Sequence, residues 1–387
     1  MSGFIFSVSK DSWESFCNNS LTNGYFTPYA IPVTEDDMSP RKRKSRNKVL
    51  AATFGDFISM RPGDNVYFLS NRKIYGIGRT VQIGSDCKYD NYLNASALLP
   101  DCRITPTHYL TTQDTRARWV FFFQPSPFFF KKGVDMDDVL RYRPQAFKVL
   151  RAFEGLSFIK IDDEENRALR EFISLVNEPS YDDINENTFS FSSNLQSRLL
   201  AEDLTAFTMD IGNALSNAEN REYVLSEMLI EGALLQGLSA GTTTAMGPWD
   251  YLTHQLIASP FKPLQYIDKI DVFGYRFSQH YQDEPKLITK YLLVEMKKDV
   301  INRAALEQTM QYVDWICNEY ASGDYSKIEA FVVGDRAARN IDESIEDICQ
   351  RSYIAETHPA KPEKWNNIKI VQYFIEENAV RFEIHEI

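Results

Sequence analysis

The sequence predicts a two-domain protein of mixed α and β structure, with an N-terminal β-barrel-like domain and a C-terminal α/β sandwich. Three observations predict this fold class. The chain has 387 residues, which is too long for one ordinary core. Short strand-like runs separated by turn signals fill the first part, and helical and strand patterns alternate in the second. We expect domains at residues 1–176 and 196–387, joined by a polar, acidic linker at 177–195.

The N-terminal domain is expected to be mostly β, with helices at its margins. Arg61-Pro62-Gly63-Asp64 has the composition of a turn, and Asn71-Arg72 can close a hairpin between the strands on either side. Helices are expected at residues 11–17 and 164–175. The expected strands cover residues 4–8, 49–54, 65–70, 74–81 and 118–123.

The C-terminal domain is expected to follow the order α-β-β-α-β. Apolar residues at helical spacing predict a helix over residues 221–238. Two strands follow at 269–277 and 287–296, then a helix at 303–320 and a strand at 328–333. The last strand-helix-strand unit should be a right-handed crossover between parallel strands, as in an α/β sandwich.

Composition and charge exclude several classes of protein. No apolar run reaches the ~20 residues that a membrane helix needs, and no secretory signal opens the chain, so a cytoplasmic protein is expected. Five dispersed cysteines without a C-x-x-C pair indicate reduced thiols, and five dispersed histidines give little support to a histidine metal site. Any bound metal should therefore be held by carboxylates.

The net charge of −12 is distributed unevenly. Residues 1–160 carry +7, and the remainder carries −19. The acidic half either only keeps the protein in solution, or it holds a cation while the basic half meets phosphates. Charge alone does not choose between these interpretations.

The residues that carry chemistry lie at the ends of the two strands expected at 269–277 and 287–296. An apolar strand ends in Glu295-Met296-Lys297, and strand periodicity places Glu295 and Lys297 on one face. Asp271 lies inside the other apolar strand. If a turn brings the two strands side by side, two carboxylates and an ammonium group converge.

This set of groups predicts a site for Mg²⁺, or for Mn²⁺ in its place. Mg²⁺ takes one or two carboxylates and keeps waters for substrate and nucleophile. Asp271, Glu295 and the carbonyl of Met296 would hold the ion, and Lys297 would orient or deprotonate the attacking water. The alternative is an ordinary Glu295–Lys297 salt bridge at a strand end.

Here the sequence resembles the PD-(D/E)XK nuclease superfamily over about residues 220–335. Asp271 is similar to the first acidic motif of that superfamily and Glu295-Met296-Lys297 to its (D/E)XK motif, although Lys269-Ile270 stands where the motif name has proline. Gln308 and Tyr312 are similar to a Q-x-x-x-Y helix that many members carry, and their spacing puts them on one helix face. The resemblance implies a further acidic ligand on the preceding helix, and either Glu227 or Glu231 could serve.

The first domain resembles EVE and PUA-like modules, which are relatives of the YTH readers. The likeness rests on the opening strand at residues 4–9, on Gly24-Tyr25-Phe26, on Met60-Arg61-Pro62-Gly63-Asp64 and on Ile74-Tyr75-Gly76-Ile77-Gly78. It implies a pocket that accepts a flipped, modified base between aromatic rings. The same rings could instead belong to the core. The candidate walls are Trp13, Tyr25, Phe26 and Trp119.

A basic cluster near the start of the chain could contact DNA phosphates without reading sequence. A mobile solvated loop or a nuclear-localisation signal are the alternatives. The cluster consists of Arg41, Lys42, Arg43, Lys44, Arg46 and Lys48.

Together these features predict a Mg²⁺-dependent endonuclease that hydrolyses DNA phosphodiesters. A modification-dependent restriction enzyme directed at foreign phage DNA would combine both expected domains. A repair nuclease that senses damage or DNA structure is the second hypothesis, and an inactive nuclease-fold scaffold is the third. Cleavage of both strands of a modified duplex would need two active sites, which is compatible with a homodimer.

Overall fold

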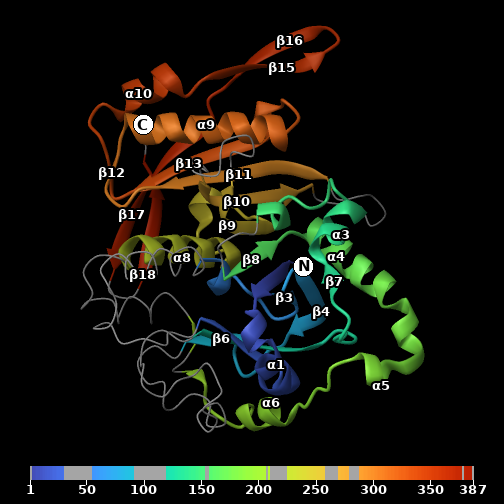
Figure 1. Ribbon diagram of the computed structural model, residues 1–387. Coiled ribbons are helices and arrows are strands. Elements are labelled where there is room, and N and C mark those ends of the chain that lie inside the picture. The colour runs from blue at the N-terminus through green and yellow to red at the C-terminus, as the bar shows by residue number, and fades with distance from the viewer. Residues whose placement is uncertain are drawn as a thin grey trace. The chain divides into compact units, whose positions relative to one another are not determined.

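The computed structural model divides the chain into two compact units (Figure 1). The first comprises Met1–Thr53 and Met60–Met209, and the second comprises Phe54–Ser59 and Asp210–Ile387. Each unit is built on one main curled β-sheet with helices, so the mixed α and β class is confirmed. No helix in the described parts of the chain is long and apolar enough to cross a membrane. The described residues are 2–29, 55–90, 119–152, 157–205, 208–209, 225–257, 269–278, 287–376 and 379–385.

The first unit has an eight-stranded mixed sheet. Its path is β2-β6-β4-β3-β1-β8, with β5 paired to β6 and β7 to β4. β1 runs parallel to β3 and antiparallel to β8, while β4 runs antiparallel to both β3 and β6. The strands are β1 (Gly3–Ser7), β2 (Tyr25–Tyr29), β3 (Asn65–Ser70), β4 (Lys73–Thr80), β5 (Lys88–Asp90), β6 (Trp119–Pro125), β7 (Val134–Asp135) and β8 (Phe158–Ile161).

Two turns of the first unit lie where the sequence predicts them. Gly63 has φ +98°, a conformation that favours glycine, and the Arg61 amide donates to Asp64 Oδ2 at 2.9 Å. Asn71 and Arg72, with φ of 48° and 63°, close the β3–β4 hairpin. Both predictions are confirmed. The strand expected at residues 49–54 lies outside the described residues.

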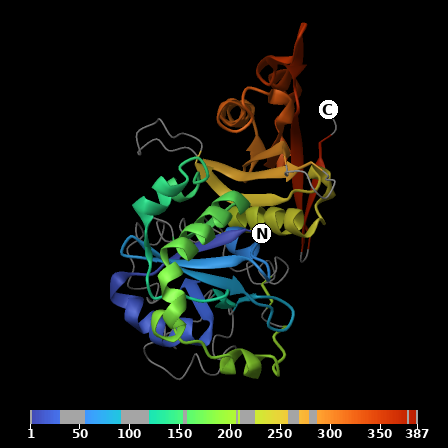
Figure 2. The ribbon, with the colours of Figure 1, turned by 90° about the vertical axis from the view of Figure 1, so that its right-hand side faces the viewer.

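Helices cover the margins of the first sheet. The expected helix at 164–175 is α4, and the one at 11–17 is a run of short helical turns. Figure 2 shows α4 passing beside the strands of its own unit. The helical segments are η1 (Lys10–Ser12), α1 (Trp13–Phe16), η2 (Cys17–Leu21), α3 (Met136–Tyr142), η5 (Leu150–Ala152), α4 (Asp163–Val176), η6 (Glu178–Asp183), α5 (Ile184–Asn187) and α6 (Asn194–Leu199).

Residues 177–195, expected as a linker, pack as part of the first unit. The Phe189 amide donates to the Phe129 carbonyl at 2.8 Å, and the two rings lie 6.2 Å apart between centroids. The polar composition of the segment gives no sign of this contact, because one partly buried ring packed on the buried Phe129 is enough to fix a polar stretch to the core. The first unit extends to Met209.

The second unit has a six-stranded mixed sheet with the order β18-β17-β13-β11-β10-β9. β13 runs parallel to both of its neighbours, β11 and β17. The remaining pairs of strands are antiparallel. The parallel β11–β13 pair is the one predicted. The strands are β9 (Tyr251–Ile257), β10 (Lys269–Phe277), β11 (Ile288–Met296), β13 (Ile328–Gly334), β17 (Ile368–Glu376) and β18 (Ala379–Ile384).

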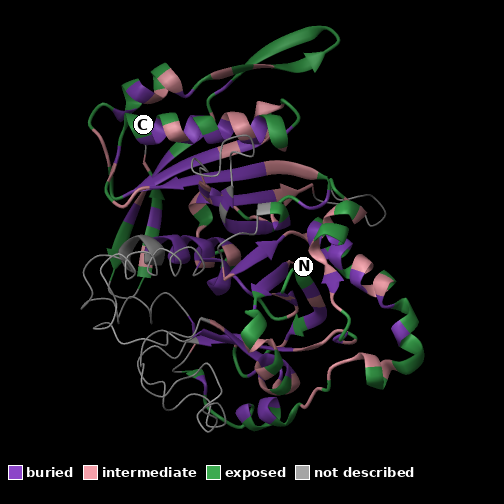
Figure 3. Cartoon of the chain, viewed as in Figure 1, coloured by how far each residue is buried: buried purple, intermediate pink, exposed green. Residues whose placement is uncertain are grey.

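Helices α8 and α9 pack against this sheet, and Figure 1 shows α9 above it and α8 below. Figure 3 shows α9 alternating buried and exposed residues, as its amphipathic sequence predicts, and the β15–β16 hairpin almost wholly exposed. Asn302 caps α9 by accepting from the Ala305 amide. The remaining elements are α8 (Leu225–Ala240), η8 (Thr244–Met246), β12 (Val300–Ile301), α9 (Arg303–Glu319), η10 (Tyr325–Lys327), β14 (Arg336–Ala337), α10 (Ile341–Ile348), β15 (Arg351–Thr357) and β16 (Ala360–Trp365).

A buried carboxyl group at the start of α4 ties that helix to the core of the first unit. Glu165 Oε1 accepts from the backbone amides of Lys148, Val149 and Leu150 at 2.7, 2.8 and 3.1 Å. Burial, together with the neighbouring Asp162 carboxylate, raises the pKa of Glu165 to about 8. In the unfolded chain a glutamate has a pKa of about 4.3.

We expect Glu165 to make the stability of the first unit depend on pH. Because the pKa is raised in the folded state, the stabilisation is complete below about pH 4.3 and is lost as the pH rises towards 8, by up to about 1.4 kcal/mol per pH unit. Glu165→Gln keeps an oxygen for the three amides but cannot ionise. Denaturant unfolding at several pH values should show wild type losing stability relative to Glu165→Gln as the pH rises, and parallel profiles would contradict the assignment.

Candidate active site

The two predicted carboxylates lie on neighbouring strands. Val272 of β10 pairs with Val294 of β11 in an antiparallel register. Asp271, just before Val272, and Glu295, just after Val294, therefore lie on adjacent strands at the same end of this pairing. Asp271 Oδ2 accepts from the backbone amide of Met296 at 2.7 Å. Glu295 is 2% exposed. The antiparallel register therefore brings together two acidic residues that are 24 positions apart in the sequence.

Lys297 connects this acidic pair to helix α9. Its ammonium Nζ forms an ion pair with Glu295 Oε1 and donates to Gln308 Oε1 at 3.1 Å. Gln308 Nε2 donates to the Tyr312 hydroxyl at 2.9 Å, one helical turn away. The side chains of Lys297, Gln308 and Tyr312 thus form one chain of hydrogen bonds. The salt bridge weighed as the alternative is present, and it lies within the larger set.

A further carboxylate approaches from α8. Glu231 Oε2 lies 2.6 Å from Nε2 of His254, whose side chain on β9 is completely buried. The side chain of Glu227, the other candidate on this helix, lies outside the described residues. The sequence does not single out His254, because Tyr251–Ile257 mixes apolar and polar residues and gives no clear strand signal.

The pKa of Asp271 reports how crowded this site is with negative charge. Burial raises the pKa well above its usual range, and the charges of Glu295 and Glu231 raise it further. The Met296 amide and His254 act in the opposite direction. Three carboxyl groups therefore interact in one desolvated region, an arrangement that favours either a shared proton or a bound cation.

The donor set fits a hard divalent cation. Asp271, Glu295 and the Met296 carbonyl offer oxygen atoms, as Mg²⁺ prefers, and a bound cation would relieve the repulsion between the two carboxylates. Among the residues that the structure describes, no group of three or more histidine, cysteine, aspartate or glutamate side chains could hold a metal ion. Asp271, Glu295 and Met296 would provide two carboxylates and a carbonyl, completed by water ligands, and Glu231 is a further carboxylate whose charge acts on Asp271.

The aromatic rings expected to stack on a base lie mainly inside the first unit. Trp119, Tyr25 and Phe26 are 2%, 3% and 6% exposed. The Phe26 ring lies in a cluster of phenylalanine rings, 5.5 Å from Phe6 between centroids. Trp13 is half-buried, with its ring 4.1 Å from that of Tyr75. In this structure the three buried rings are core residues, and Trp13 is the candidate that keeps an accessible surface.

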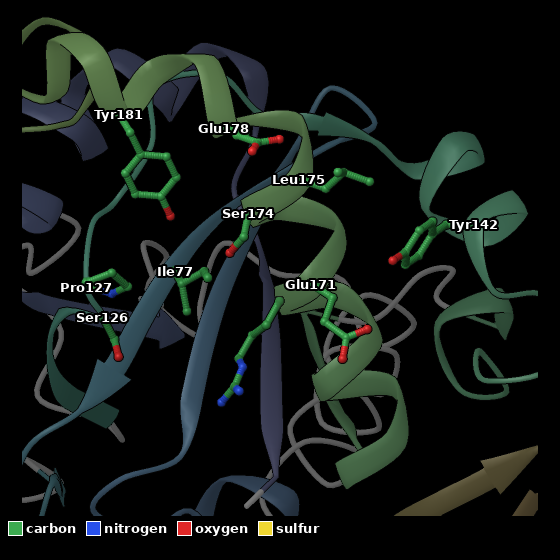
Figure 4. A pocket seen from close by; sticks show the side chains of 10 residues that line it. Ile77, Ser126, Pro127, Tyr142, Glu171, Ser174, Leu175, Glu178 and Tyr181 are labelled. Atoms are coloured by element: carbon green, nitrogen blue, oxygen red, sulfur yellow. The ribbon is translucent and has the colours of Figure 1, made fainter.

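A pocket on the first unit lies apart from these four rings (Figure 4). Its volume is about 780 Å³, and Figure 4 shows the rings of Tyr181 and Tyr142 on different sides of the space beside α4. Tyr181 is 40% exposed. The pocket is lined by Ile77, Ser126, Pro127, Tyr142, Arg170, Glu171, Ser174, Leu175, Glu178 and Tyr181.

The basic cluster from Arg41 to Lys48 lies outside the described residues, so its contact with phosphates stays a prediction. The cysteines Cys17, Cys87, Cys317 and Cys349 are free and buried.

Comparison with known proteins does not assign this chain to a family. No family description matches it, and neither does any curated protein. Several solved structures resemble part of it, including these two. A hypothetical protein from Leishmania major is 10% identical and covers 47% of this chain and 97% of its own, with a TM-score of 0.28. A protein from Pseudomonas putida is 15% identical and covers 45% and 98%, with a TM-score of 0.26. Likenesses at these TM-scores carry no inference about fold or function.

Proposed function

We propose that this protein is a Mg²⁺-dependent endonuclease that hydrolyses phosphodiester bonds in DNA. One observation carries the proposal: Asp271 and Glu295 lie on paired strands, and Lys297 connects Glu295 to Gln308 on the neighbouring helix. Buried charged groups are costly unless they are paired or bind a ligand, so a cluster of this kind is a candidate functional site. In phosphodiester hydrolysis the two acidic residues would hold a metal ion, and the lysine would orient the attacking water.

When bound, Mg²⁺ would neutralise charge on the scissile phosphate and promote ionisation of a water molecule. Asp271 and Glu295 would hold the ion, and the Met296 amide fixes the orientation of the Asp271 carboxylate. Lys297, 32% exposed at its side chain, can reach solvent and a phosphate oxygen. Its ammonium would orient the attacking water. A new P–O bond would form as that water loses a proton to solvent, and the bridging P–O ester bond would break as the leaving oxygen takes a proton from solvent.

Gln308 and Tyr312 would position the lysine rather than contact substrate. Gln308 Oε1 accepts from the Lys297 ammonium and the Gln308 amide group donates to the Tyr312 hydroxyl, so both helix residues restrict the rotamers of Lys297. Such restriction keeps the charge where the transition state develops.

We propose further that the first unit recognises modified DNA and that the protein acts in restriction of foreign DNA. The resemblance of the first unit to base-reading modules and the positive charge of residues 1–160 support this part. Trp13 offers a partly exposed ring for stacking, and the pocket beside α4 offers Tyr142 and Tyr181.

Matched duplexes test the function as a whole. We expect wild-type protein with Mg²⁺ to cleave duplex DNA carrying modified cytosine or adenine and to leave the unmodified duplex of the same sequence intact. Addition of EDTA should stop cleavage. Equal cleavage of both duplexes would favour a repair nuclease, and cleavage that continues in EDTA would contradict the metal-dependent mechanism.

A further inference from the structure

A short segment near residue 56 contributes to the candidate active site although the sequence on both sides of it belongs to the first unit. Phe54–Ser59 is part of the second unit. Within it Asp56 is 6% exposed, and its Oδ1 accepts from the backbone amide of His254 at 2.7 Å and from the Thr253 hydroxyl at 3.4 Å. These partners lie 197 and 198 residues further along the chain.

Glycine at position 55 allows this close approach. A Cβ atom at Gly55 would lie 2.5 Å from Cδ1 of Leu235 on α8, so with a larger residue either the segment or the Leu235 side chain would have to shift. Because Leu235 lies one helical turn beyond Glu231, the segment packs on the part of α8 that carries the acidic side chain.

His254 links Asp56 to that acidic side chain. Its backbone amide donates to Asp56, while its ring Nε2 lies 2.6 Å from Glu231 Oε2. His254 pairs across the sheet with Val272, the neighbour of Asp271. His254 thus donates a hydrogen bond from its backbone amide and forms a second one through its ring, and both bonds are almost completely shielded from water.

We propose that Asp56 and His254 are positioning residues for Glu231. Asp56 fixes the backbone of β9 at His254, and the imidazole fixes the orientation of the Glu231 carboxylate. Without the imidazole, a buried carboxylate would turn towards another donor or towards water. Groups that orient the ligands of a metal ion typically change metal affinity by about 10- to 100-fold.

This inference rests on the proposed function, because it assumes that Glu231 contributes to the affinity for a divalent cation. Asp56 and His254 both lie outside the predicted motif, and Asp56 comes from the first part of the sequence. The carboxylate of Asp56 and the imidazole of His254 would contact neither substrate nor the ion.

Mn²⁺ binding by the full-length protein, measured by calorimetry, tests the proposal. We expect His254→Leu and Asp56→Ala to weaken Mn²⁺ binding about 10- to 100-fold. His254→Gln retains a donor for Glu231, and Asp56→Asn retains the acceptor for the His254 amide. Both conservative variants should therefore bind Mn²⁺ within about threefold of wild type, an outcome that an undirected loss of packing would not produce. His358→Leu, on the exposed hairpin, is the matched control and should bind as wild type does.

The Mg²⁺ dependence of DNA cleavage separates positioning from general damage. Positioning predicts that the half-saturating Mg²⁺ concentration rises in His254→Leu and that saturating Mg²⁺ restores most of the rate. A lower rate with an unchanged Mg²⁺ half-saturation would overturn the proposal. If Asp56→Ala or His254→Leu fails to fold, a tenfold loss of Mn²⁺ affinity in the folded conservative variants would overturn it as well.

Mn²⁺ binding separates the proposed function from the positioning roles of Asp56 and His254. If wild type binds no Mn²⁺, the proposed function fails and this inference fails with it. If wild type binds Mn²⁺ and Glu295→Gln abolishes binding, but His254→Leu binds as tightly as wild type, only the positioning roles are wrong.

Discussion

Lys297→Met is expected to lower the single-turnover rate of Mg²⁺-dependent DNA cleavage about 10³-fold, which corresponds to ~4 kcal/mol of transition-state stabilisation. Methionine has a similar length and fills the space beside Gln308, but it carries no charge and donates no hydrogen bond. The charge on the phosphate and the orientation of the attacking water would both lose their partner. Quenched-flow or gel assays with labelled duplex at saturating protein and Mg²⁺ would measure the loss.

Lys364→Met is the matched control for this variant. Lys364 lies on β16 in the exposed β15–β16 hairpin of the same unit. We expect it to cleave within about twofold of wild type, because an exposed lysine far from the chemistry contributes little. The same 10³-fold loss in both lysine variants would mean that the effect reflects overall charge, and full activity of Lys297→Met would remove Lys297 from the mechanism.

Phe26→Ala is expected to destabilise the first unit by about 3 to 5 kcal/mol, because it leaves a cavity in a ring of aromatic side chains. The centroid of Phe26 lies 5.1 Å from that of Phe68, 5.4 Å from Phe16 and 5.5 Å from Phe6. Denaturant unfolding followed by tryptophan fluorescence and circular dichroism would measure the change.

Leu175→Ala provides the comparison for the same unit. Leu175 is 54% exposed on α4, so its truncation should cost less than about 1 kcal/mol. If Phe26→Ala unfolds like wild type but no longer binds modified DNA, the ring is a wall of the base pocket, and its assignment to the core is wrong.

The parts of the fold with strong local signals could be predicted from the sequence. Gly63 and the Asn71-Arg72 pair mark turns through backbone conformations that few residues adopt, and the structure has both turns. Glu295, Lys297 and Asp271 stand out because charged residues seldom interrupt or end a buried strand. The face shared by Gln308 and Tyr312 follows from helical spacing alone.

Other parts of the fold depend on contacts between residues that are far apart in the sequence, which a local sequence pattern does not reveal. β9 has polar residues at Thr253 and His254, and their burial depends on Asp56, almost 200 residues earlier. The strands β17 and β18 lie beyond the expected α-β-β-α-β order, and their exposed residues weaken the apolar signal. The sequence of residues 177–195 predicts a linker, because its few aromatic residues stand among many polar neighbours.

The most direct test of a metal-dependent nuclease is single-turnover cleavage of a modified duplex at increasing Mg²⁺ concentration, with wild type and Asp271→Asn purified in parallel. Asparagine keeps the oxygen that accepts from the Met296 amide and removes the negative charge. We predict a rate that saturates with Mg²⁺ for wild type and falls about 10³-fold in Asp271→Asn, as expected when a group that stabilises the transition state is lost. Equal rates for the two proteins, or no dependence on Mg²⁺, would contradict the assignment of this cluster as the active site.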